Sequence, residues 1–327
     1  MDRNVGNDPV IGGLQRAATL GELGRYSEAI VVINQVLAHD PGNQPAHCMA
    51  ANLSLSAGNF AQARTAAERA IALDPEDEWP HRIRSVALIN LHRPKDALKA
   101  AREAVRLSPD SPETQIALCE AELENANPPN STTGRNHLAL AEEAAAHVLR
   151  MIPDAPEGQH CLGRIALKKG KWKEAEEHFR KALELDPEDY ESMNNLGVAQ
   201  IRQRGQRKQA MDTFHQAVRM SPAADPARTN LHASARRYLY GGVAVALFLF
   251  TRLFGFWDVA TDRGLAMIIG LGVLLFIGAG VLVWNRRKNL SADTKLMMRA
   301  HFRSGPTPWL IGVAVAGVIV SIIVRLN

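Results

Sequence analysis

Cysteine is scarce in this 327-residue chain, which contains only three copies of it. Cys48, Cys119 and Cys161 form no CxxC spacing, so the sequence offers neither a zinc knuckle nor a disulfide framework. Each cysteine lies among small apolar residues in a segment predicted to be helical. We therefore expect buried, reduced thiols.

Motifs for catalysis are also missing. The chain has no phosphate-binding GxxxxGKS or GxxxxGKT, no HExxH and no serine or cysteine in a nucleophile elbow. Glu176, Glu177 and His178 are adjacent, but neighbours on a helix point in different directions and cannot converge on a metal. We expect no enzymatic activity, no cofactor and no metal site.

Excess positive charge is absent from most of the chain, although the net charge is +4 and the pI is near 9.0. The tail from Ala223 onward carries 12 of the 38 Lys and Arg but only 4 of the 34 Asp and Glu, a net of +8. The preceding residues hold the remaining 26 and 30, a net of −4. This acidic balance removes the main support for nucleic-acid binding by the first two thirds of the chain.

Prolines recur at a nearly constant spacing through those two thirds. The intervals between six of them are 34, 34, 44, 34 and 35 residues, and each has an alanine twelve residues before it. The prolines are Pro41, Pro75, Pro109, Pro153, Pro187 and Pro222, and the alanines are Ala29, Ala63, Ala97, Ala141, Ala175 and Ala210. A period of this length predicts a solenoid of stacked units, which usually presents a surface for binding.

The fifth unit shows how each repeat is built. Two apolar stripes at helical spacing, over residues 162–166 and 175–183, are separated by a short turn at Gly170. Ala175 is expected where two antiparallel helices cross closely, because only a small side chain lets the backbones approach. Pro187 closes the unit, since proline disfavours helix in the residue before it. Each repeat is therefore predicted to be a pair of antiparallel helices.

These columns resemble the tetratricopeptide repeat, a helix–turn–helix unit of 34 residues. The resemblance covers about residues 10–222 and is strongest over CLGRIALKKGKWKEAEEHFRKALELDP and NNLGVAQ, in the fifth and sixth units. It implies an all-α fold, a right-handed superhelical solenoid of about six repeats preceded by a tail over residues 1–9. The fourth unit departs from the pattern by ten extra residues, 125–134, which we predict to form a mobile surface loop.

The resemblance also implies a concave groove lined by the first helix of each repeat. The family's groove positions fall on Cys48 and on polar residues that we take as candidates for peptide binding: Asn52, Arg82, Glu120, His160, Arg164, Asn194 and Asn195. Relatives that grip a C-terminal carboxylate carry several Lys, Arg and Asn there. Arg164 and Asn195 fit that chemistry, but the first repeat offers Leu14 and Ala18 in place of Lys and Asn. The groove is of mixed sign, which argues against a strongly charged ligand.

Three apolar runs follow the repeats, at residues 239–257, 264–284 and 309–324. A bilayer core requires about 20 apolar residues as a helix, so we predict three membrane spans, with a buried soluble hairpin as the alternative. Trp257, Trp284 and Trp309 stand at the ends of the runs, as in the aromatic belts of membrane interfaces. Residues 223–238 are predicted to form a helix that caps the last repeat and leads into the first span.

Lysine and arginine predict the orientation of these spans. The loop over residues 258–263 has one Arg and two Asp, whereas the loop over 285–308 carries six Lys and Arg. Because positive residues stay inside, the repeats and the basic loop are expected in the cytoplasm and the C-terminus outside. Residues 1–14 lack the pattern of a cleavable signal peptide, which agrees. Arg252, inside the first run, is either a functional charge or reaches the interface by snorkelling.

Within the basic loop, Arg286, Arg287 and Lys288 are candidates for contact with the anionic inner leaflet. The alternative is that these charges act as a topology signal alone. Pairs of small residues such as Gly312 and Ala316 permit close contact between spans, so homo-oligomerisation stays open.

Together these features predict a scaffold in a bacterial inner membrane that binds protein or peptide partners in its groove. One alternative is an accessory subunit of a membrane transport, secretion or envelope-assembly complex. Another is a co-chaperone that holds peptides.

Overall fold

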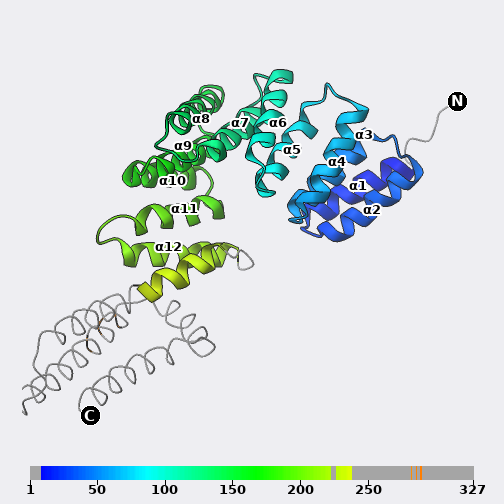
Figure 1. Ribbon diagram of the computed structural model, residues 1–327. Helices are drawn as coiled ribbons and strands as arrows, with labels where there is room; N and C mark the ends of the chain where they lie inside the picture. Colours follow the sequence, from blue (N-terminus) through cyan, green and yellow to red (C-terminus); the bar gives the residue numbers. More distant parts are fainter. Residues whose placement is uncertain (1–8, 222–225, 238–280, 282–284, 286–287, 289–327) are drawn as a thin grey trace, which may run out of the picture. The chain divides into compact units, whose positions relative to one another are not determined.

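The computed structural model describes residues 9–221 and 226–237, together with the single residues 281, 285 and 288 (Figure 1). The regular structure within these residues is entirely helical, as the repeat pattern predicts. The chain divides into two compact units, Met1–Pro187 and Glu188–Asn327. Among the described residues, no helix is both long and apolar enough to cross a membrane. Apart from Val281 of the second, the three predicted spans lie outside the described residues.

Over residues 9–187, the described part of the first unit, ten helices form five antiparallel pairs. Their bounds are α1 (Pro9–Glu22) and α2 (Tyr26–His39), α3 (Gln44–Ser56) and α4 (Phe60–Leu73), α5 (Glu78–Asn90) and α6 (Pro94–Leu107), α7 (Pro112–Asn125) and α8 (Thr132–Met151), and α9 (Pro156–Lys168) and α10 (Trp172–Leu185). Each pair corresponds to one predicted repeat. The first five repeat prolines all lie in the turns that follow the second helices.

The first helices begin at side-chain caps that recur with the repeat. Asn43, Asp77 and Ser111 follow one another at 34-residue intervals and precede α3, α5 and α7. Their side-chain oxygens accept hydrogen bonds from backbone N–H groups of the first turn, at 2.9, 3.0 and 3.4 Å respectively. Such caps satisfy donors that have no partner inside the helix, and each typically stabilises it by about 1 kcal/mol. The starts of the second, third and fourth repeats are thus fixed locally, whereas α9 begins at Ala155 without a side-chain cap.

The alanine column packs the two helices of each repeat together. Ala29, Ala63, Ala97, Ala141 and Ala175 each have 0% exposure, as expected where only a small side chain permits close approach. The core of the first unit is accordingly a chain of small clusters, each between neighbouring helices. A solenoid of this kind depends on contacts between neighbouring repeats.

The first helices of neighbouring repeats also pack against one another (Figure 1). This holds for α1 with α3, α3 with α5, α5 with α7, and α7 with α9, whereas no two second helices make a comparable contact within the described residues. One surface of the first unit is therefore lined by α1, α3, α5, α7 and α9. We call it the first-helix face. The handedness of the predicted superhelix stays a prediction.

The turn between the helices of a repeat requires a left-handed residue. Gly24 and Gly58 have φ of 71° and 75°, and the equivalent residue of the third repeat is His92, with φ of 57°. Glycine adopts this conformation at little cost, whereas a side chain with Cβ is strained there. The third repeat thus keeps the turn at the expense of some local strain.

The predicted loop over residues 125–134 is shorter in the structure. Only residues 126–131 lie between α7 and α8, because Asn125 ends α7 and residues from Thr132 onward belong to α8. The Ser131 Oγ caps α8 by accepting from the Gly134 N–H at 2.9 Å. The Asn125 amide donates to the Pro94 carbonyl of α6 at 2.8 Å. The extra residues therefore lengthen α8 to 20 residues as well as form a loop.

The second unit contains α11 (Tyr190–Ile201), α12 (Arg207–Met220) and a helix over residues 226–237. Phe214 and Met211 of α12 form a core with Leu231, and Ala227 and Ala235 belong to the same cluster. Three buried residues at four-residue spacing give helix 226–237 one apolar face. Helix 226–237 follows α12 and buries its apolar side. That it leads into a first span stays a prediction.

Candidate functional site

Four of the predicted groove residues lie on the first-helix face and remain accessible to solvent. Asn52 of α3 is exposed, and Arg82 of α5, Glu120 of α7 and Arg164 of α9 are partly exposed. None of the four is needed to fill the core, so their side chains are available for contacts with a ligand. The structure brings only two of them together.

Arg164 joins α9 to α7 through two carboxylates. Its Nη1 lies 3.1 Å from the Glu120 Oε1, and its Nη2 lies 3.1 Å from the Glu124 Oε1. Burial alone would lower the pKa of Arg164, but Glu120, with smaller contributions from Cys161 and Glu124, outweighs it, so the pKa is raised. Two carboxylates against one guanidinium leave this part of the face with a net negative charge. Sequence reasoning selected Glu120 and Arg164 but missed Glu124.

Arg82 has its acidic partner on its own helix. The Arg82 Nε lies 3.3 Å from the Glu78 Oε2, one turn earlier in α5. Side-chain exposures of 28% for Arg82 and 26% for Glu78 keep the pair within reach of a ligand. A partly exposed pair one turn apart contributes only about 0.3–0.5 kcal/mol to helix stability, so exchanging it for ligand contacts costs little.

His160 lies in the interior of its repeat. Its ring packs edge-on against Phe179, with ring centroids 5.7 Å apart, and the residue is only 8% exposed. This contact explains the histidine as part of the packing between α9 and α10. Its position offers little surface to a ligand.

Asn194 and Asn195 belong to the second unit. The Asn230 amide of helix 226–237 donates to the Asn194 Oδ1 at 3.0 Å, and Asn195 is half-buried beside it. Of the membrane-surface candidates, Arg286 and Arg287 lie outside the described residues, whereas Lys288 is helical and exposed.

A buried acidic residue, Glu122, was not predicted from the sequence. It is 1% exposed, and its two oxygens meet Arg102 of α6, at 2.9 Å, and the Nδ1 of His137 of α8. A buried carboxylate requires such partners, because removing a charge from water is costly unless hydrogen bonds replace the lost hydration. The network ties α6, α7 and α8 together and has a structural role.

The cysteines are free and buried, as expected. Burial and the carboxylate of Asp77 raise the pKa of the Cys48 thiol to about 12. A hydrogen bond with Cys161, together with burial, raises the pKa of the Cys119 thiol well above its ordinary range. Thiols in this state are poor nucleophiles. Within the part of the chain that the structure describes, no group of His, Cys, Asp and Glu is arranged to hold a metal ion.

Comparison with protein families identifies the repeats. Residues 22–83 and residues 156–189 each match a tetratricopeptide repeat model. The chain contains tetratricopeptide repeats. The helix pairs, the buried alanine column and the proline turns of the intervening residues follow the same pattern.

Solved structures share this tetratricopeptide-repeat fold at low sequence identity. PilW, described as a widely conserved type IV pilus biogenesis factor, is 17% identical, with a TM-score of 0.53 over 69% of this chain and 100% of its own. A tetratricopeptide repeat protein from Parabacteroides merdae is 12% identical, with a TM-score of 0.53 over 82% and 99%. Cut9–Hcn1 of the APC/C is 16% identical, with a TM-score of 0.56 over 69% and 42%. No curated protein sequence matches the chain.

Proposed function

We propose that the chain is a scaffold that binds protein or peptide partners on the first-helix face, beside a membrane. One observation carries the proposal: the first helices pack side by side and present Asn52, Arg82, Glu120 and Arg164 to solvent. Stacked repeats create extended binding surfaces of this kind. Nothing in the core accounts for polar side chains at these positions.

The charges on this face favour a ligand of mixed polarity. Glu120 and Glu124 already neutralise Arg164, and Glu78 neutralises Arg82. A C-terminal carboxylate would have to displace these acidic partners and would meet the surplus negative charge near Arg164. Such like-charge contacts cost affinity. A segment with both basic and apolar side chains fits better than a free carboxylate.

The membrane location is proposed from the sequence. Residues 239–257, 264–284 and 309–324 supply the apolar length for three spans, and the Lys- and Arg-rich loop over 285–308 supports a cytoplasmic location of the repeats. Limited trypsin treatment tests this arrangement. The repeats should be digested in inverted membrane vesicles and protected in intact spheroplasts. Protection in both, or recovery of the chain in the soluble fraction, contradicts it.

An accessory subunit of an envelope-assembly complex is the second candidate function. PilW, a pilus biogenesis factor, has the same fold, which makes this role compatible with the architecture. The two candidates differ in what the partner contacts. A scaffold holds its partner through the first-helix face, whereas a subunit holds it through the spans.

Chemical cross-linking in membranes, followed by purification of the full-length chain in mild detergent, separates the two. Arg82→Glu changes the charge on the first-helix face, and Lys99→Glu makes the same change on α6, where the side chain is 82% exposed. A scaffold loses its cross-linked partner in the Arg82 variant and keeps it in the Lys99 variant. Retention in both variants favours the subunit.

A further inference from the structure

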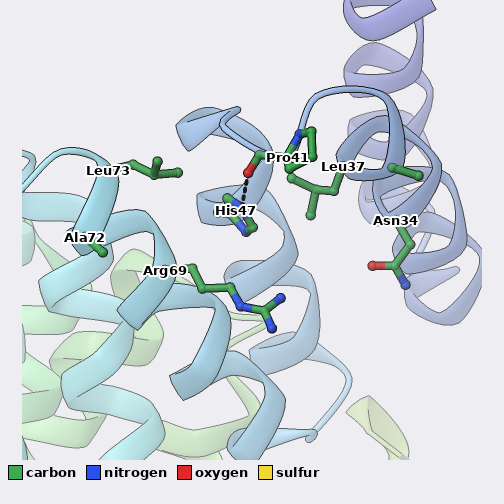
Figure 2. Close-up of a pocket in the computed structure, with 8 residues that line it drawn as sticks. Asn34, Leu37, Pro41, His47, Arg69, Ala72 and Leu73 are labelled. Carbon is green, nitrogen blue, oxygen red and sulfur yellow. Dashed lines mark hydrogen bonds between the residues drawn. The ribbon is translucent and has the colours of Figure 1, made fainter.

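The junction of the first two repeats contains a pocket of about 560 Å³ (Figure 2). It lies between α2, the turn that follows it, and α4. The lining residues are Asn34, Leu37, Ala38, Pro41, His47, Arg69, Ala72 and Leu73. Its volume falls in the range that holds a small ligand or a few side chains of a partner.

The pocket has apolar walls and a cationic side. Leu37, Pro41 and Leu73 supply apolar surface, and Leu73 is 46% exposed. In Figure 2, Arg69 extends from α4 across the pocket, on the side where Asn34 of α2 projects. The His47 Nε2–H donates to the Pro41 carbonyl at 3.0 Å, which fixes the turn that closes the pocket.

Arg69 has no acidic partner within the described residues. Glu68, its neighbour on α4, faces two other cations, since it lies 3.7 Å from Arg64 and 3.8 Å from Arg84. Asp40, at the end of α2, accepts a hydrogen bond from the Asn43 amide at 2.9 Å. The guanidinium therefore presents unused donors to the pocket.

The junction of the second and third repeats carries charged side chains that the first junction lacks. One repeat of 34 residues later, Glu103 stands in place of Arg69 and Arg106 in place of Ala72. Arg106 Nη2 lies 2.8 Å from Glu103 and 3.8 Å from Glu76, so this junction contains its own carboxylates and a long side chain. At the first junction neither Glu103 nor Glu76 has an acidic counterpart, since Arg69 and Gly42 stand in their places, and Ala72 leaves the space open. A ligand that brings a carboxylate restores the charge balance found one repeat later.

We propose that this pocket binds a segment of a partner protein in which an Asp or Glu adjoins a leucine-sized side chain. The carboxylate pairs with Arg69, to which an arginine can donate two hydrogen bonds, and the Asn34 amide lies on the same side of the pocket. The apolar side chain packs on Leu37 and Leu73. The site is formed mainly by second helices and a turn, so it is separate from the first-helix face and allows the scaffold to hold two partners at once.

Calorimetric titration of the full-length chain in mild detergent tests the proposal with two capped peptides. The probes are acetyl-Ala-Leu-Asp-Leu-Ala-amide and its counterpart with Asn in place of Asp, which differ only in the carboxylate. The wild-type chain should bind the Asp peptide at least about tenfold more tightly than the Asn peptide, as expected for a charge-assisted pair. Equal binding of the two peptides, or no measurable binding of either, overturns the proposal.

Variants locate the binding in the pocket. Arg69→Ala should bind both peptides equally weakly, and Ala72→Arg should fill the pocket with the residue that α6 already carries at this position and abolish binding. Arg82→Glu, on the first-helix face, should leave the titration unchanged, so the result is independent of the proposed groove function. Circular dichroism melting checks that each variant is folded. Unchanged binding in folded Arg69→Ala or Ala72→Arg contradicts the site.

Discussion

Gly163 of α9 lies against the ring of Phe179 of α10, with no room for a side chain between them. A Cβ placed on Gly163 would lie 2.6 Å from the ring, which is fully buried. The same relationship recurs one repeat later, where Gly197 faces Phe214 within the second unit. The glycine and the aromatic ring therefore form one packing unit in the fifth and sixth repeats.

Replacing Gly163 with alanine should destabilise the fifth repeat by about 1–3 kcal/mol, because overpacking forces the buried ring from its place. Gly12→Ala is the matched control, since a Cβ at that exposed position of α1 meets nothing within 4 Å. This change should be neutral or stabilising, because alanine favours helix over glycine. Urea unfolding followed by circular dichroism measures both. Equal effects of the two changes would show that the contact is unimportant.

His92→Gly should raise stability by about 0.5–1 kcal/mol. The φ of His92 is 57°. The free energy gained by relieving this left-handed strain exceeds the entropic cost of the greater flexibility of glycine in the unfolded chain. His92→Ala keeps a Cβ and so should bring no gain. Thermal melting of the two variants checks this difference, and a lower melting temperature for His92→Gly would contradict the strain.

A hydrogen bond across the repeat turn recurs from different residues. The side chains of His47, His81 and Gln115 approach the carbonyls of the repeat prolines Pro41, Pro75 and Pro109, at 3.0, 3.2 and 2.8 Å. We therefore expect His47→Gln to be close to wild type in urea unfolding. His47→Ala should lose about 0.5–1.5 kcal/mol, the usual contribution of one hydrogen bond. A similar loss of unfolding free energy in both variants would mean that the His47 ring contributes through packing and not through its hydrogen bond to Pro41.

Stability should decline as the pH falls below about 6.5 in part because of His178. Burial, with a smaller effect from Lys181, lowers the pKa of His178. The folded chain thus prefers the neutral ring. The contribution of His178 to the free energy of unfolding is complete above the unfolded pKa and is lost as the pH falls toward the folded pKa. His178→Gln can still donate to the Gln159 Oε1, which the wild-type Nδ1 meets at 3.0 Å. The variant should lose less unfolding free energy between pH 7.5 and pH 5 than the wild type, and an identical loss would exclude His178.

The helix pairs could be predicted from the sequence because their determinants are local and periodic. Proline turns and the alanine column recur in every repeat, and capping residues recur at 34-residue intervals before α3, α5 and α7. The loop over 125–134 was overestimated because Pro128 and Pro129 indicate a break, whereas Ser131 starts a new helix within the same segment. The helix cap at Ser131 lies so close to the helix-breaking Pro128 and Pro129 that composition alone does not separate the two signals.

The pairing of Glu120 with Arg164 could have been found from the sequence. Each is the ninth residue of its first helix, in neighbouring repeats, so opposite charges at one repeat position predict contact. The partners of Glu122 carry no such signal, because Arg102 and His137 come from the second helices of two different repeats. The pocket at Arg69 likewise carries no direct sequence signal, because it depends on the lack of a large side chain at position 72, where the residue is alanine.

Site-specific photo-cross-linking in membranes tests the central claim that the first-helix face binds a protein partner. A photoreactive amino acid replaces Asn52 on that face in one variant and Lys99 on α6, where the side chain is 82% exposed, in the other. Binding on the first-helix face should give a discrete cross-linked protein from position 52 and none from position 99. No product at position 52, or the same product at both positions, would contradict it.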